Sequence, residues 1–192
     1  GQEQVKEDAR GYAAELKRRI SEEKQIAVKV LLSEVRRTAE SAATFVKELE
    51  ELIQKEGLQG ITLLSPRKDA DIKTTGTLGP LLEKGTSKLE AYPAWVTMDE
   101  TELKDLGVRT PTEIFNVIKK FADKKSTLSE RLSEDGPSLD YVCWTHETTH
   151  GAVLKGFGHE PVRPNFTEPI EVDMDASGKS KIIFRGKEFP IS

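Results

Sequence analysis

Cysteine, histidine and long apolar runs are all scarce in this chain. Its 192 residues include one cysteine, Cys143, and three histidines. A single cysteine excludes an internal disulfide framework and fits a reducing compartment. No stretch approaches the ~18 consecutive apolar residues of a membrane-spanning helix, and the first residues do not have the pattern of a signal peptide. We therefore expect a soluble protein with no membrane partner.

A strong charge of one sign is also lacking. Lysine and arginine number 29, aspartate and glutamate number 33, and the net charge is −4. Broad binding to nucleic acid needs a concentrated basic surface, which this balance does not favour. The length allows one compact domain with an appendage, or two small domains.

The first part of the chain has the spacing of an amphipathic helix. Between residues 5 and 53, apolar side chains recur at intervals of three, four and seven. Glycine, proline, asparagine and aspartate are absent from Tyr12 to Glu56, and Gly57 is the expected stop. Residues 1–57 are therefore predicted to form one long helix or a helical hairpin. So long a stripe suggests a coiled coil or self-association through residues 5–53.

The rest of the chain is predicted to comprise a loop-rich connector over residues 58–97 and an α+β domain over 98–192. The connector has possible short strands at 61–64 and 94–97. In the domain, a short helix over 99–106 ends at Gly107, and Thr110 to Glu113 form a capping box with Pro111 at the first helical position. The segment from Glu102 to Val108 resembles the end of a sterile-alpha-motif or helix-hairpin-helix module.

Near the end of the chain, apolar and polar residues alternate as they do in β-strands. Residues 170–174 and 181–185 flank a polar turn at 175–179, which predicts a β-hairpin. The turn partly matches a phosphate loop and a calcium loop, but each lacks a required residue and a polar turn explains both matches. The predicted fold class is α+β: a long N-terminal helix or helical hairpin, then a small mostly helical domain ending in a β-hairpin.

One motif has the pattern of a zinc-binding catalytic site. His146 and His150 flank Glu147 in the pattern H-E-x-x-H, within a predicted helix over residues 139–155. Residues four apart share a helix face, so both imidazoles could bind one zinc ion while Glu147 acts as general base. A third ligand is expected from His159, which ends a G-x-x-H word; Glu160, Glu168 and Glu171 are the alternatives.

Residues 146–151 resemble the corresponding sequence segment of the zincin metallopeptidases, in particular the thermolysin-like and fungalysin-like families. That resemblance implies a zinc-dependent hydrolase acting on a peptide or protein substrate. The metal would lower the pKa of its bound water toward ~7 and polarise the scissile carbonyl. The alternative is a non-enzymatic helical interaction or oligomerisation module, viral and toxin-associated modules included, in which the histidines are structural.

Overall fold

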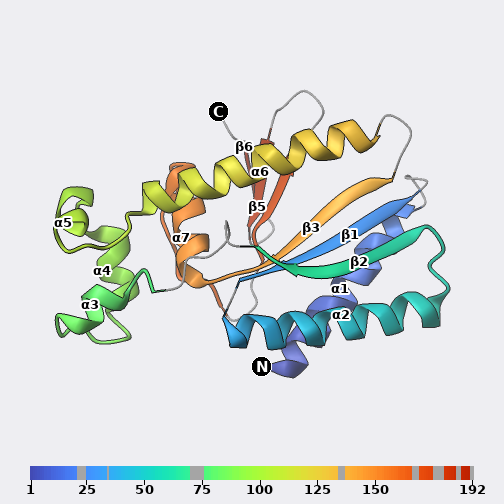
Figure 1. Ribbon diagram of the computed structural model, residues 1–192, viewed down its shortest axis with the longest axis horizontal. Helices are drawn as coiled ribbons and strands as arrows, with labels where there is room; N and C mark the ends of the chain where they lie inside the picture. The colour runs from blue at the N-terminus through green and yellow to red at the C-terminus, as the bar shows by residue number, and fades with distance from the viewer. Residues whose placement is uncertain are drawn as a thin grey trace. The chain divides into compact units, whose positions relative to one another are not determined.

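The computed structural model describes residues 1–20, 25–33, 35–69, 76–133, 137–165, 169–174, 180–184 and 187–190 (Figure 1). The chain divides into two compact units, each made of two segments. Unit 1 comprises residues 1–73 and 127–145, and unit 2 comprises residues 74–126 and 146–192. This division differs from the sequence-based boundaries near residues 57 and 97, because a strand late in the chain belongs to unit 1.

The predicted α+β class is confirmed. The described helices are α1 (Gln2–Ile20), α2 (Arg36–Glu56), α3 (Gly79–Glu83), α4 (Ala91–Thr97), α5 (Glu100–Asp105), α6 (Pro111–Ser133) and α7 (Glu147–Gly156). The described strands are β1 (Ile26–Leu32), β2 (Ile61–Lys68), β3 (Ser138–Trp144), β4 (Glu171–Met174), β5 (Ser180–Phe184) and β6 (Lys187–Pro190). No helix in these ranges is both long and apolar enough to span a bilayer.

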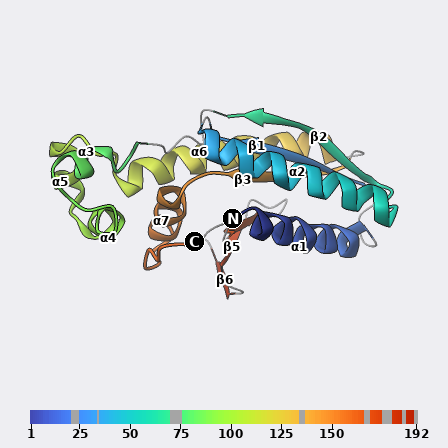
Figure 2. The same cartoon turned by 90° about the horizontal axis from the view of Figure 1, so that it is seen from below.

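Unit 1 is built on a parallel sheet with the strand order β2-β1-β3. Central strand β1 is apolar on both faces, as expected for a buried parallel strand. Its residues Ile26, Val28, Val30 and Leu32 form one core with the apolar faces of α1 and α2. Both helices therefore pack on the same face of the sheet (Figure 2).

Strand β1 corrects the prediction of one long helix or a helical hairpin over residues 1–57. Helices α1 and α2 do pack against each other, as in a hairpin, but a strand lies between them in the chain. The apolar stripe of α1, which includes Val5, Ala9 and Leu16, is fully buried within this same chain. The stripe that suggested self-association therefore forms part of the chain's own core.

Strand β2 lies at one edge of the described sheet, and its register shifts after Leu64. Beyond the shift, the Asp69 N–H donates to the Leu32 carbonyl, so residues 67 and 69 direct their backbone groups toward β1. The preceding residue, Pro66, therefore directs its nitrogen toward the open edge, where proline is tolerated. Lys29 Nζ donates to the Ser65 carbonyl at 2.6 Å, within the irregular segment.

Unit 2 begins with the short helices α3, α4 and α5, followed by the first part of α6. The capping box predicted for α6 is confirmed: Thr110 N–H donates to Glu113 Oε2 at 2.9 Å, and Glu113 N–H donates to Thr110 Oγ1 at 3.2 Å. The strand expected at 94–97 is wrong, because these residues belong to α4. Tyr92 and Trp95 of that helix are buried in an apolar core with Leu103 and Ile114.

The predicted C-terminal hairpin is confirmed and gains a third strand. β4 pairs antiparallel with β5, with Val172 opposite Ile182, and β5 pairs antiparallel with β6. The expected turn at 175–179 lies outside the described residues. The buried Phe184 of β5 packs with Val153 and Leu154 of α7, and this contact anchors the hairpin within unit 2.

Candidate functional site

The histidine motif occupies a strand-to-helix junction instead of the middle of a helix. β3 ends at Trp144, and His146 is the extended N-cap residue of α7, with φ −127° and ψ 162°. The prediction of helix over residues 139–155 is therefore wrong in its first half. The aromatic and β-branched residues Tyr141, Val142 and Trp144 favour a strand, and their pairing with β1 decides the outcome.

This junction changes the relation between the two histidines. An N-cap residue does not have helical dihedral angles, so His146 and His150 do not share a helix face in the way that two helical residues four apart would. The His146 carbonyl accepts from Thr149 N–H at 2.9 Å and lies 3.4 Å from His150 Nδ1. The backbone of His146 thus serves to start the helix, and the His150 ring packs against that same turn.

Glu147, the predicted general base, is the first residue of α7 and pairs with an arginine. Arg163 Nε donates to Glu147 Oε2 at 2.8 Å, and both side chains remain partly exposed, at 46% for Arg163 and 33% for Glu147. A carboxylate at this position also interacts favourably with the positive end of the helix dipole. The carboxylate therefore has two stabilising interactions, one with Arg163 and one with the helix N-terminus.

His159 lies beyond the far end of α7. Gly158, with φ +75°, ends the helix, while the N–H groups of Gly158 and His159 donate to the Lys155 and Leu154 carbonyls. Gly156 is the last residue of α7, and the chain changes direction at Gly158. The helix between His146 and His159 is about 15 Å long at 1.5 Å per residue.

The other candidate ligands are no closer to forming a set. Glu160 and Glu171 are exposed, and Glu168 lies outside the described residues. Within the part of the chain that the structure describes, no three histidine, cysteine, aspartate or glutamate side chains form a group that could hold a metal ion. The spacing of the motif is thus present in the sequence without an assembled ligand set around it.

Tyr92 of α4 lies near the start of α7, and the sequence gave no reason to select it. Its side chain is buried, and its hydroxyl donates to the Val162 carbonyl at 3.2 Å. A Cβ atom built on Gly151 of α7 would lie 2.5 Å from that hydroxyl. Glycine at this position therefore allows α7 to pass directly over the tyrosine ring.

Burial, followed by the nearby Glu147 carboxylate, raises the pKa of Tyr92 to about 12, while Arg163 acts in the opposite direction. The phenol consequently remains a neutral hydrogen-bond donor at physiological pH.

Residues 160–165, which we call the strap, follow the end of α7 without regular secondary structure. Prolines at positions 161 and 164 favour an extended backbone and cannot donate to a strand ladder. Two successive strap residues are held: Val162 through its carbonyl by Tyr92, and Arg163 through its guanidinium by Glu147. The strap is therefore held on α4 and α7 by one backbone contact and one charged contact.

Two further hydrogen bonds fix the helices beneath the strap. Lys155 Nζ of α7 donates to the Val96 carbonyl of α4 at 3.0 Å, and the fully buried Trp95 donates through Nε1 to the Arg109 carbonyl at 2.8 Å. A lysine near the carbonyl end of a helix is also electrostatically favourable. We call the surface made by α4 and α7 under the strap the platform.

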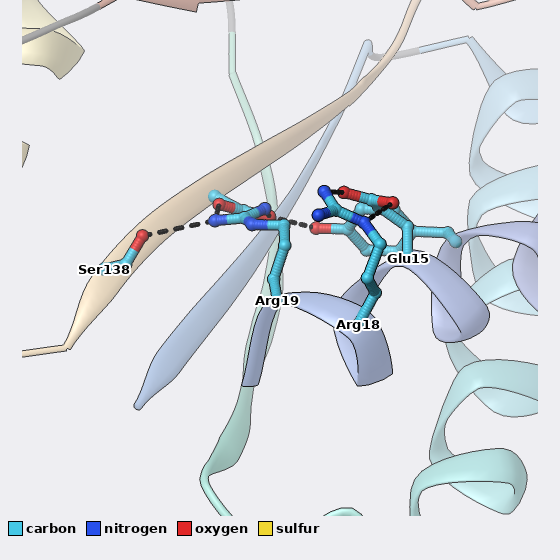
Figure 3. A network of polar contacts seen from close by, with 6 residues as sticks. Glu15, Arg18, Arg19 and Ser138 are labelled. Carbon is cyan, nitrogen blue, oxygen red and sulfur yellow. Dashed lines mark hydrogen bonds and ion pairs between the residues drawn. The ribbon is translucent and has the colours of Figure 1, made fainter. Parts of the chain in front are cut away.

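The other prominent polar cluster lies in unit 1 and joins α1 to β3 (Figure 3). Arg19 binds both carboxylate oxygens of Asp140, at 2.6 and 3.1 Å, and also approaches Ser138 Oγ at 3.3 Å. The Tyr12 hydroxyl donates to Asp140 Oδ2 at 2.7 Å. Neighbouring Arg18 pairs with Glu15 one turn earlier on α1. Both oxygens of Asp140 are thus already engaged, which indicates a structural role for this cluster.

The chain matches no known protein-family model, and no curated protein has significant sequence similarity to it.

Proposed function

We propose that this chain is a non-enzymatic interaction module that binds an extended segment of a partner protein on the platform. One observation carries the proposal: residues 160–165 of the same chain, which have no regular secondary structure, are bound there through the Val162 carbonyl and the Arg163 side chain. A donor to a backbone carbonyl, combined with a side-chain contact that selects one residue type, is a common means of recognising extended peptides. Tyr92 supplies the first contact and Glu147 the second.

The geometry of the histidine motif supports the same proposal. His146 starts α7, His150 packs against the first turn, and Glu147 binds Arg163. Each of these three residues therefore has a structural role that needs no metal. In this proposal the two histidines stabilise the start of α7, and the start of α7 places the Glu147 carboxylate at the edge of the platform.

The platform has a definite chemical preference. A neutral phenol donor selects an accessible backbone carbonyl, and a carboxylate at a helix N-terminus selects a cation, best of all the forked guanidinium of arginine. Prolines on both sides of the recognised residues restrict the free peptide, so less conformational entropy is lost on binding. The partner segment should therefore carry an apolar residue followed by arginine, between prolines.

Fluorescence anisotropy tests the proposal with a labelled peptide that has the sequence of residues 159–165. We expect saturable binding to the full chain and about two- to fivefold weaker binding to Glu147→Gln. Glu83→Gln removes an equal charge from α3 and should bind like the unmodified chain. Equal affinity for Glu147→Gln and the unmodified chain would refute the proposed contact, provided that circular dichroism shows both proteins folded.

Zinc-dependent hydrolysis is a second candidate. Two observations favour it: a three-stranded sheet precedes the motif, and His150 Nδ1 lies beside a backbone carbonyl, an arrangement common for zinc-binding histidines. His146 and His150 would bind zinc, and Glu147 would act as base after leaving Arg163. Metal analysis of protein purified without chelators decides this: stoichiometric zinc retained in Glu147→Gln, with hydrolysis lost, supports it, and no zinc in either protein excludes it.

A further inference from the structure

We infer that the strap regulates the platform by competing, as a ligand within the same chain, with the partner segment. This inference rests on the proposed function and adds both a partner pattern and a mechanism of control. The partner would carry a proline, an apolar residue, an arginine and a second proline, as strap residues 161–164 do. The closed strap is the inhibited state, and its release frees the Tyr92 hydroxyl and the Glu147 carboxylate for another peptide.

The strap is held weakly enough to be displaced. Its charged contact, Arg163 with Glu147, joins two partly exposed side chains, so water and salt screen the attraction. Val162 is 39% exposed, although its carbonyl accepts the Tyr92 hydrogen bond. Among the described residues, none from the strap belongs to an apolar core cluster of unit 2. Release of the strap therefore exposes little apolar surface.

The platform does not depend on the strap for its shape. Tyr92 and Trp95 are almost completely buried in the core that also contains Ala152 of α7. Lys155 ties α7 to the Val96 carbonyl independently of the strap. A preformed platform can accept a second peptide without first paying the entropy of ordering its own side chains.

The connection between α7 and the strap allows this exchange. Gly158 and His159 close the helix with two backbone hydrogen bonds to α7, and the strap begins immediately after them. Gly158 has the positive φ that favours glycine at this position. The strap can therefore move away from the platform while the end of α7 keeps its own hydrogen bonds.

The test compares the unmodified full chain with Arg163→Ala, using the labelled peptide of residues 159–165. Arg163→Ala removes the charged contact of the strap but leaves Tyr92 and Glu147 intact. We expect the peptide to bind this variant about two- to fivefold more tightly than the unmodified chain, as the loss of one partly exposed ion pair allows. Lys104→Ala removes a cation from α5 and should leave peptide affinity unchanged.

A second comparison identifies the contact. A peptide in which alanine replaces the arginine should bind Arg163→Ala about two- to fivefold more weakly than the original peptide. Glu147→Gln combined with Arg163→Ala should lose the gain. Equal affinity of the unmodified chain and Arg163→Ala for the original peptide overturns the competition but leaves the proposed function standing. Binding to neither protein, with both folded by circular dichroism, overturns the inference and the proposed function together.

Discussion

Replacing Gly151 by alanine should destabilise unit 2, although alanine normally stabilises a helix. Gly151 lies inside α7, where alanine is favoured over glycine by about 1 kcal/mol on propensity alone. Its new Cβ would lie 2.5 Å from the Tyr92 hydroxyl and 3.2 Å from Trp95 Cζ3. Both rings are almost completely buried, so neither can move aside without disturbing the core.

The expected magnitude follows from three opposing contributions. Overpacking of a filled core costs about 1–3 kcal/mol. Displacement of the Tyr92 hydroxyl from the Val162 carbonyl costs about 1 kcal/mol more. Against these stands the propensity gain of about 1 kcal/mol. We therefore expect Gly151→Ala to lower the free energy of unfolding by about 1–3 kcal/mol, with partial release of the strap.

Urea unfolding followed by tryptophan fluorescence measures this change, because Trp144 lies in unit 1 and Trp95 in unit 2. Gly11→Ala is the matched control: Gly11 lies inside α1, and a Cβ there would have no neighbour within 4 Å. It should raise stability by about 0.5–1 kcal/mol. If both substitutions stabilise the protein, the packing of α7 over Tyr92 is refuted.

Three further changes test other parts of the structure. Asp140→Asn weakens the paired contact with Arg19, and we expect about 1–3 kcal/mol less stability in urea unfolding; an unchanged midpoint would contradict the role of this cluster. Thr110→Ala removes half of the α6 capping box and should cost about 1 kcal/mol, measured as a lower melting temperature. Burial raises the Tyr92 pKa from 10.0 to about 12, so in that interval the unfolded chain holds fewer protons than the folded one. Stability should therefore be complete below pH 10 and fall toward pH 12, and Tyr92→Phe should flatten this decline.

The sequence alone predicts the structure correctly where that structure depends on residues close together in the chain. The cap of α6 needs only Thr110 and Glu113, three residues apart, and both hydrogen bonds form as predicted. Gly107, which ends α5, has the positive φ that its position requires. The terminal hairpin likewise follows from alternation across a short turn. Such features can be predicted because no distant residue has to be known.

Strands β1 and β3 could not be predicted in the same way. A strand that is apolar on both faces lacks the alternation of a half-buried strand, so the run from Ile26 to Leu32 also fits a helical stripe. The spacing of Leu139, Val142 and Cys143 also fits a helix, which explains why a helix and not strand β3 is predicted there. The parallel pairing of Val28 with Asp140 joins segments far apart in the chain, and that pairing determines the conformation of both.

The candidate site shows the same limit. The sequence identifies Glu147 through its motif, but its contact with Arg163 depends on the reversal at Gly158. The Tyr92 hydrogen bond to Val162 spans 70 residues and has no sequence signal. The spacing of prolines at 161 and 164 was the one available indication of an extended segment there.

The irregular edge of β2 bears on how this protein avoids aggregation. An exposed edge strand is a template on which identical chains can add and form fibrils. Here Pro66 presents no donor to an incoming strand, and Arg67 and Lys68 bring exposed positive charges that repel the same edge of a second molecule. An incoming strand would find regular backbone partners only along residues 61–64. The β2 edge of this sheet is therefore a poor seed for polymer growth.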